Sequence, residues 1–282
     1  MISSERYISL VIDSSSSRDY APAICIYCGR DTTTYATFMS IMLSMLVKPG
    51  LLLSAASLIW VGGSPPHIAP KKSEESRFIG VEKKGSKTIV MVVSGFLKHT
   101  VCITCIAETV VILARSCPSH PFSQVTLDVL CGNASVVDVR ITPTFLVGWV
   151  LIAAATLLRL TCYRYLGRFF TFELALREGH KLITTGPYSI VRHPAYTGVF
   201  LAFAGIALIQ MSSGSWWNEC AGLWSTVFGK AAASLWLTIL GGTLTTFVLR
   251  TGAEDKVLRD EFGEQWDNWA KRTPYKLFPG IY

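Results

Sequence analysis

The segment AYTGVFLAFAGIALIQM, residues 195–211, carries no charged side chain. A helix of this length is close to the minimum that crosses a hydrocarbon core of about 30 Å, since each residue adds about 1.5 Å. Half of the 282 residues are hydrophobic and 16% are charged. Four other apolar segments are long enough to span a membrane: 38–61, 89–114, 144–166 and 222–249. We therefore predict an all-α, polytopic integral membrane protein with about five transmembrane helices, four to six being compatible with the pattern.

Two of these segments contain charged residues. Lys48-Pro49-Gly50 stands near the middle of the first, which predicts a broken helix or a re-entrant hairpin whose freed backbone groups are covered by protein. The second contains Lys98, His99 and Glu108. An ionisable side chain inside a membrane is a functional candidate by default. For Lys98 and His99 we favour the simpler interpretation, a pair near a misplaced helix boundary.

The formal net charge of +7 follows the membrane topology. Lysine and arginine gather in segments 62–88 and 159–194, whereas 116–143 holds only Arg140 and 212–221 holds neither residue type. By the positive-inside rule, the basic segments are cytoplasmic and the N-terminus is outside or luminal. The basic loops would then face anionic lipid. The charge thus predicts membrane lipid, and no nucleic acid, as a partner.

The N-terminal part of the chain divides into an extension and a membrane region. Residues 1–37 include the serine run 14–17 and no long apolar core, so we predict a mobile extension and no signal peptide. Membrane helices follow within 38–158, joined by a basic cytoplasmic loop, 62–88, and a luminal loop, 116–143.

Eight cysteines raise the question of a metal site or a disulfide. Two C-x-x-C pairs are present, Cys25/Cys28 and Cys102/Cys105. The second lies in an apolar span, where cysteine commonly acts as a small hydrophobe, so we predict no metal. Cys117 and Cys131 share the luminal loop, where a disulfide is permitted but spacing alone does not establish it. Asn133 begins a glycosylation sequon on the same side.

The polar sequence before segment 195–211 is the main functional candidate. His193 precedes a proline, which disfavours helical backbone there, and Pro194 suits the first position of a helix. The free backbone N–H groups of that helix would form a site for a carboxylate or phosphate. Tyr188 and Tyr196 flank it with aromatic faces. The alternative is an interfacial belt that anchors the helix end at the lipid headgroups.

The end of the last span supplies charged groups to the same face of the membrane. Arg250 and Glu254 are four residues apart, so they share one helix face and either pair with each other or hold two ligands. An amphipathic pattern follows that suits the membrane surface: Leu258, Phe262, Trp266 and Trp269. A membrane hairpin over 195–249 would bring both polar ends together in one pocket, open sideways to lipid.

These motifs resemble those of a known enzyme family. HKLITTGPYSIVRHPAYTG, residues 180–198, the hairpin, and R-x3-E-D-x2-L-x3-FG-x2-W-x2-W from Arg250 resemble the isoprenylcysteine carboxyl methyltransferases over 159–282. The resemblance implies a multi-pass enzyme of the endoplasmic reticulum that methylates the C-terminal carboxylate of prenylated cysteine in proteolysed CaaX proteins. It implies S-adenosylmethionine (SAM) as cofactor, with these contacts: His180, Lys181, Leu182, Ile183, Tyr188, His193, Pro194, Ala195, Tyr196 and Glu254.

The resemblance also assigns the chemistry. Arg250 would contact the prenylated substrate, and Arg250 and Glu254 would be the catalytic pair. Glu173 stands where the family commonly has glutamine, and Asp255 where it has a second glutamate. Three alternatives remain open: an NADPH-dependent sterol reductase, which shares RHPxYxG and the final P-x-I-Y; a phospholipid N-methyltransferase; and a non-catalytic membrane scaffold.

Overall fold

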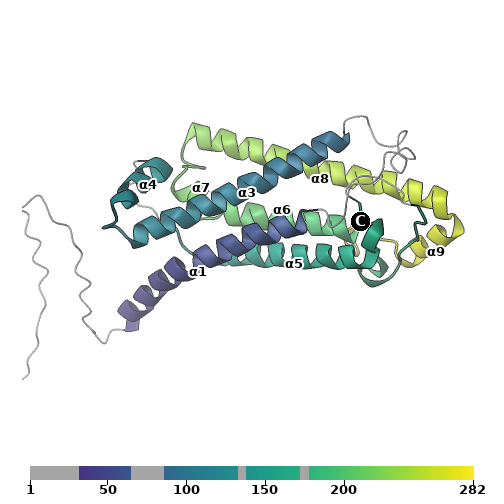
Figure 1. The fold of residues 1–282 in the computed structure, drawn as a ribbon, viewed down its shortest axis with the longest axis horizontal. Coiled ribbons are helices and arrows are strands. Elements are labelled where there is room, and N and C mark those ends of the chain that lie inside the picture. The colour runs from purple at the N-terminus through teal and green to yellow at the C-terminus, as the bar shows by residue number, and fades with distance from the viewer. Residues whose placement is uncertain (1–31, 65–85, 133–137, 172–177) are drawn as a thin grey trace, which may run out of the picture.

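The computed structural model describes residues 32–64, 86–132, 138–171 and 178–282. Within these ranges the chain is helical and contains no strand, and long helices run side by side as an elongated bundle (Figure 1). The long helices are α1 (Thr32–Gly62), α3 (Ser86–Ser116), α5 (Pro143–Leu166), α6 (Pro194–Met211) and α8 (Val227–Phe262). The short ones are α4 (Pro121–Cys131), α7 (Trp216–Glu219), α9 (Glu264–Arg272) and the 3-10 turns η2 (Gly167–Phe169) and η3 (Gly186–Ser189).

The predicted all-α membrane architecture is confirmed. Four stretches of the described chain are long and apolar enough to cross a bilayer: Val92–Ser116, Pro143–Phe169, Pro194–Glu219 and Val227–Phe262. They correspond to four of the five predicted spans. The fifth expectation, on α1, is met only by a shorter apolar stretch, Val47–Gly62.

Helix α1 differs from the sequence predictions in two respects, its continuity and its starting residue. It runs through Pro49 without interruption, so the broken helix and the re-entrant hairpin were wrong. It also begins at Thr32, inside the predicted extension 1–37, and residues 1–31 lie outside the described chain. Most of the predicted loop 62–88 lies outside it as well.

Helices α5 and α6 pack with their backbones in close contact. A Cβ atom added to Gly148 would lie 2.8 Å from the carbonyl oxygen of Gly205, and one added to Gly205 would lie 2.6 Å from that of Gly148. Small residues allow such an approach between membrane helices, where dispersion and weak polar contacts replace the hydrophobic effect. Around this contact lies the apolar core, which includes Leu52, Phe145, Ile152, Ile206 and Ile209.

The charged residues in the first two spans form a buried cluster. Nζ of Lys48 lies 2.6 Å from Oε1 of Glu108, and it donates to the carbonyls of Arg140 (2.7 Å) and Gly214 (2.6 Å). The other oxygen of Glu108 accepts from the backbone N–H of Trp216 at 2.9 Å. A buried charge is tolerated when it is paired and hydrogen-bonded. The two charges that made α1 and α3 look unlike membrane helices therefore join them.

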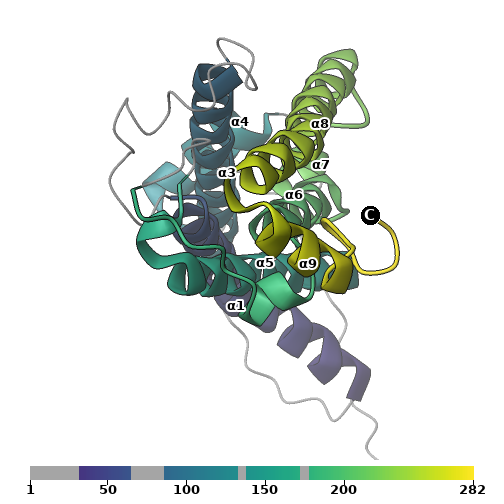
Figure 2. The same ribbon diagram turned by 90° about the vertical axis from the view of Figure 1, so that its right-hand side faces the viewer.

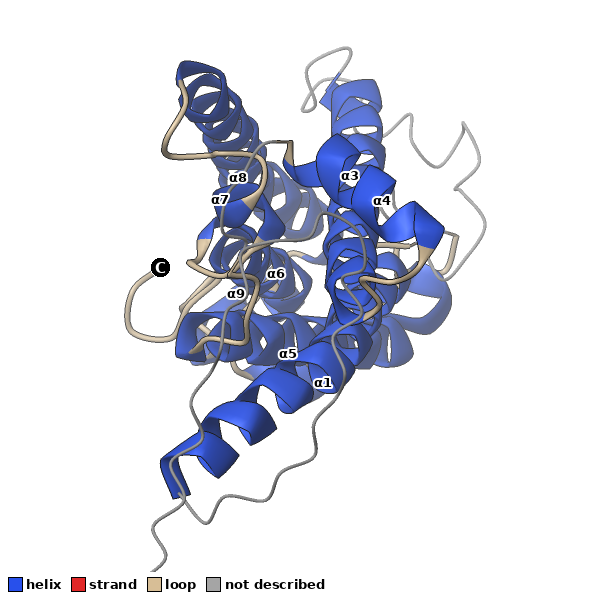
Figure 3. Cartoon of the chain, turned by 90° about the vertical axis from the view of Figure 1, so that its left-hand side faces the viewer, coloured by secondary structure: helices blue, strands red, loops and turns tan. Residues whose placement is uncertain are grey.

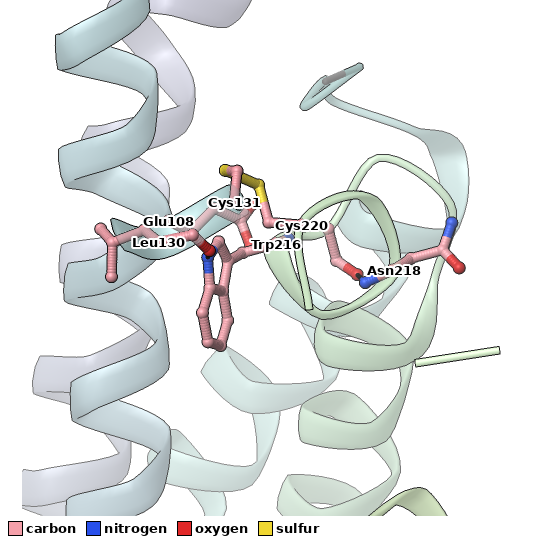
Figure 4. Close-up of a disulfide and its surroundings, with 7 residues drawn as sticks. Glu108, Leu130, Cys131, Trp216, Asn218 and Cys220 are labelled. Atoms are coloured by element: carbon pink, nitrogen blue, oxygen red, sulfur yellow. Dashed lines mark hydrogen bonds between the residues drawn. A yellow bond between two sulfur atoms is a disulfide. The ribbon is translucent and has the colours of Figure 1, made fainter. Parts of the chain in front are cut away.

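Near this cluster a disulfide links Cys131, at the end of α4, to Cys220, just after α7 (Figure 4). The Trp216 indole also donates to the carbonyl of Leu130 at 3.0 Å. The pairing of Cys117 with Cys131, which the sequence left open, does not occur, and Cys117 is exposed and free. The predicted loop 116–143 contains α4, which Figure 3 shows lying across the end of the bundle. Asn133 lies outside the described residues.

At the opposite end, α8 continues beyond its apolar part to Phe262, farther than the predicted hairpin end at residue 249. Gly263, with φ of 51°, then turns the chain into α9, because this left-handed backbone conformation suits a residue without a Cβ atom. Residues 273–282 follow α9 around this end of the bundle (Figure 2).

Candidate functional site

A cavity of about 190 Å³ opens among α1, α3, α5, α6 and α8 and the segment around η3. Most of the residues that the sequence analysis singled out line this cavity: His180, Leu182, Ile183, Tyr188, His193, Ala195, Tyr196, Arg250 and Glu254. Two do not line it: Lys181 is exposed, and Pro194 is buried at the start of α6. Glu173 lies outside the described residues. The structure thus brings together residues from two distant sequence motifs.

One stripe of α8 forms a long wall of the cavity. Its residues recur at steps of three and four, and from Thr243 to Leu258 they extend about 22 Å at 1.5 Å per residue. Along this wall the apolar ring of Phe247 is followed by Arg250 and Glu254. The cavity therefore has an apolar part and a polar part, and Arg250 begins the polar part.

His193 is held between two carboxylates. Its Nδ1 atom lies 3.2 Å from Oε2 of Glu254, and its Nε2 atom lies 3.0 Å from Oδ1 of Asp255. Burial disfavours the charged ring, but hydrogen bonds and the charges of these carboxylates outweigh it and raise the pKa of His193. The ring also stacks on Tyr196, with centroids 5.7 Å apart. An imidazolium at this position fixes the carboxylate of Glu254 at the cavity wall.

Asp255 positions the His193 ring, a role that the sequence did not indicate. Its Oδ2 atom lies 3.3 Å from the guanidinium of Arg192 and 3.7 Å from the ammonium of Lys276. Asp255 does not line the cavity, and it contacts His193 from the far side. Its place directly after Glu254 on a helix was the available signal, because neighbouring residues face different directions.

The start of α6 is not the open anion site that the sequence suggested. The backbone N–H groups of Arg192 and His193 donate to the carbonyls of Tyr275 (3.0 Å) and Lys276 (2.8 Å). The N–H groups of Tyr196 and Thr197 both donate to the carbonyl of His193. These four N–H groups are therefore already hydrogen-bonded within the protein and are less available to a ligand than the sequence suggested.

Helix α9 packs against the site. The Trp269 side chain, expected at the membrane surface, is buried, and its indole donates to the carbonyl of Tyr188 at 3.0 Å. Trp266 lies beneath the guanidinium groups of Arg192 and Arg259, 5.7 and 5.9 Å from its ring centre. The turn at Gly263 causes this difference, since it directs α9 back toward η3.

Two cavity residues come from positions to which the sequence analysis gave no role in the site. Arg159 donates to the carbonyls of Gly62 (2.6 Å) and Ala195 (3.0 Å), so it joins α5 to α1 and α6. Lys98 lines the cavity and lies within the apolar stretch Val92–Ser116. The neighbouring His99 is exposed. The signal for Lys98 was its charge inside an apolar span.

The cavity also has a polar atom that protein does not satisfy. Within the described chain, the buried Nδ1 of His180 has no hydrogen-bond partner, and burial lowers the pKa of this ring. Phe169 lies against it, with centroids 4.7 Å apart. Across the described ranges, no group of three or more histidine, cysteine or acidic side chains is arranged to hold a metal ion. The arrangement suits an organic ligand with polar and cationic groups.

Comparison with known proteins relates this chain to membrane methyltransferases. Residues 143–236 match the family model described as phospholipid methyltransferase. The protein-S-isoprenylcysteine O-methyltransferase B of Arabidopsis thaliana is 30% identical over 129 residues, which are 45% of this chain and 55% of that protein. The resemblance to the isoprenylcysteine carboxyl methyltransferases is confirmed.

A second relative carries a different name. The nickel-cobalt-cadmium resistance protein NccN of Alcaligenes xylosoxydans xylosoxydans is 27% identical over 160 residues, 56% of this chain and 61% of that protein. The chain thus spans little more than half the length of these curated relatives. The matched family model contains α5, α6 and the beginning of α8, and it ends before Arg250 and Glu254. Residues 143–236 are thus similar to membrane methyltransferases.

Proposed function

We propose that this protein transfers a methyl group from SAM to the C-terminal carboxylate of a prenylated cysteine. One observation carries the proposal: Arg250 and Glu254 line one cavity with His193, and that cavity has an apolar wall inside a membrane bundle. The substrates would be proteolysed CaaX proteins at the endoplasmic reticulum, with the prenyl chain arriving from lipid.

The donor side of the cavity fits SAM, which supplies an electrophilic methyl group on a sulfonium. Glu254, with 32% of its side chain exposed, presents a carboxylate for the ammonium of the amino-acid end. The unsatisfied Nδ1 of His180 offers a further hydrogen-bonding atom. The rings of Tyr196 and Phe169 also line the cavity. These residues would hold the cofactor.

The acceptor side needs orientation more than proton transfer. A C-terminal carboxylate is ionised at neutral pH, so its methylation requires no general base. Arg250 would hold it by charge-assisted hydrogen bonds, and the apolar wall around Phe247 would hold the prenyl chain. Exclusion of water strengthens both interactions and frees the attacking oxygen from hydration.

A phospholipid amine is the second candidate acceptor, because the matching family model is that of the phospholipid methyltransferases. A cationic or neutral amine gains nothing from Arg250, however. The charges at the cavity therefore favour the carboxylate.

The test uses membranes that contain the full chain, SAM with a labelled methyl group, and N-acetyl-S-farnesylcysteine. We expect the wild type to form base-labile methyl ester. The rate of ester formation should fall at least about hundredfold in Glu254→Ala and in Arg250→Ala, since each change should remove about 3 kcal/mol of transition-state binding. Glu254→Ala should also weaken SAM binding, whereas Arg250→Ala should leave it intact. Lys230→Gln, an exposed change near the other end of α8, is the matched control.

Full activity in either alanine variant would remove its residue from the mechanism. Label in phospholipid and none in farnesylcysteine would establish the second candidate. If neither phospholipid nor farnesylcysteine is labelled and the protein reduces a sterol with NADPH, the reductase alternative would be established.

A further inference from the structure

Lys98 is a cation in the cavity that the proposed reaction does not yet use. Its ammonium donates to the carbonyl of Gly63 at 3.2 Å and lies 5.1 Å from the ring centre of Trp60. An ammonium has three N–H donors, and a carbonyl and a ring do not neutralise its charge. Inside a membrane span, such a group calls for an anion.

The other lysine of the membrane bundle provides a comparison within the same chain. Lys48 has a carboxylate, Glu108, at 2.6 Å and two carbonyl acceptors at 2.7 and 2.6 Å. That is the contact set of a lysine with a purely structural task. Lys98 has one long hydrogen bond and faces the cavity. Across the described ranges, no carboxylate is paired with it.

The cavity around Lys98 is predominantly cationic. Arg159, which donates to Gly62 beside the Lys98 acceptor Gly63, lines it together with Arg250. Among the described lining residues, Glu254 is the sole carboxylate, and it is paired with His193. An anionic group that enters this cavity would be attracted from α3, α5 and α8 at once. In Figure 2, α3 and α8 are the two upper arms of the bundle.

We propose that Lys98 is a specificity-determining residue that binds the acceptor carboxylate together with Arg250. This inference rests on the proposed function and adds a contact from α3, outside the part of the chain that matches the family model. The ammonium would favour an ionised carboxylate over a neutral or cationic headgroup. Gly63 and Trp60 would hold its aliphatic stem and one N–H in place.

The test compares two ligands with the same tail, N-acetyl-S-farnesylcysteine and its carboxamide, by binding to the full chain in nanodiscs. Wild type should prefer the acid. Lys98→Gln should weaken binding of the acid about tenfold, the value of one charge-assisted hydrogen bond, and leave the carboxamide unchanged. Lys98→Arg should restore most of the preference. Lys230→Gln and the Kd for SAM should show no change.

Three results would overturn the inference. Equal weakening of both ligands in Lys98→Gln would mean that Lys98 only supports the end of α1. An unchanged preference for the acid would mean that Lys98 does not contact the carboxylate. Phosphatidic acid could inhibit ligand binding in the wild type and not in Lys98→Gln, while both proteins still prefer the acid to the carboxamide. That result would identify a lipid phosphate as the ligand of Lys98.

Failure of the proposed function gives a different pattern. Wild type would then form no methyl ester, whatever its preference between acid and carboxamide. Because the binding measurement needs no turnover, the role of Lys98 is tested in either case.

Discussion

The Nε2 atom of His193 lies 3.0 Å from Oδ1 of Asp255, and this contact ties the start of α6 to the C-terminal extension of α8. The pair stands directly behind the Glu254 carboxylate, which His193 contacts with its other nitrogen. The geometry of the donor site therefore depends on a charge that varies with pH.

We expect the stability of the protein to reflect this charge. The folded-state pKa of His193 is raised, so its contribution is fully present below about pH 6.5, the ordinary value, and is lost as pH rises through the folded-state pKa. Thermal unfolding in detergent should show this slope above about pH 6.5. His193→Gln should flatten it, and the exposed control His99→Gln should keep it. Asp255→Asn should lower the His193 pKa measured by NMR; an unchanged value would contradict the assignment.

His180 should act in the opposite direction. Burial lowers its pKa, so protonation favours the unfolded chain and stability falls as pH drops below about 6.5. His180→Gln should remove this acid-side loss and leave the slope above it. Bound SAM that uses the neutral ring should lower the His180 pKa further, which the same NMR titration would report.

The glycine contact between α5 and α6 predicts a strong steric effect. Gly205→Ala places a methyl group 2.6 Å from the Gly148 carbonyl, so the helices must separate, at a cost of about 1–3 kcal/mol. Gly241→Ala is the matched control, because a Cβ atom there has no neighbour within 4 Å. Thermal unfolding should distinguish the two variants, and equal stability would contradict the close packing.

The ion pair at the α4 and α7 end predicts a second stability effect. Lys48→Met leaves the Glu108 carboxylate buried without its cation, which costs about 3–5 kcal/mol. The double variant Lys48→Met/Glu108→Leu should recover part of this loss. Recovery stays partial because the carbonyls of Arg140 and Gly214 also lose a donor. A double variant less stable than Lys48→Met would show that the pair is not a unit.

Much of the fold was predictable because membrane spans depend on a local property. Apolar length alone located α3, α5 and α6 to within a few residues. The errors came from contacts between distant residues. Lys48 predicted a break in α1 because its partner Glu108 is sixty residues away, and the disulfide partner Cys220 lies 89 residues from Cys131.

The site was predictable to the extent that motifs mark it. Residues of the 180–198 motif and the Arg250/Glu254 pair do line one cavity. The sequence did not indicate that the N–H groups of Arg192 and His193, just before α6, donate to the carbonyls of residues 275 and 276. The contacts of Lys98 were not predictable, because Trp60 lies near the end of α1 and Gly63 directly follows that helix.

The pairing of Arg192 and His193 with Tyr275 and Lys276 has a consequence for how the protein is made. A nascent chain that has inserted α5 and α6 still lacks the acceptors for these two N–H groups until more than sixty further residues have been synthesised. Long-range contacts of this kind form late, because they require closure of a long loop. The donor site should therefore mature only after residues 275 and 276 have left the ribosome, and chains stopped after α8 should insert into the membrane without becoming competent to bind SAM.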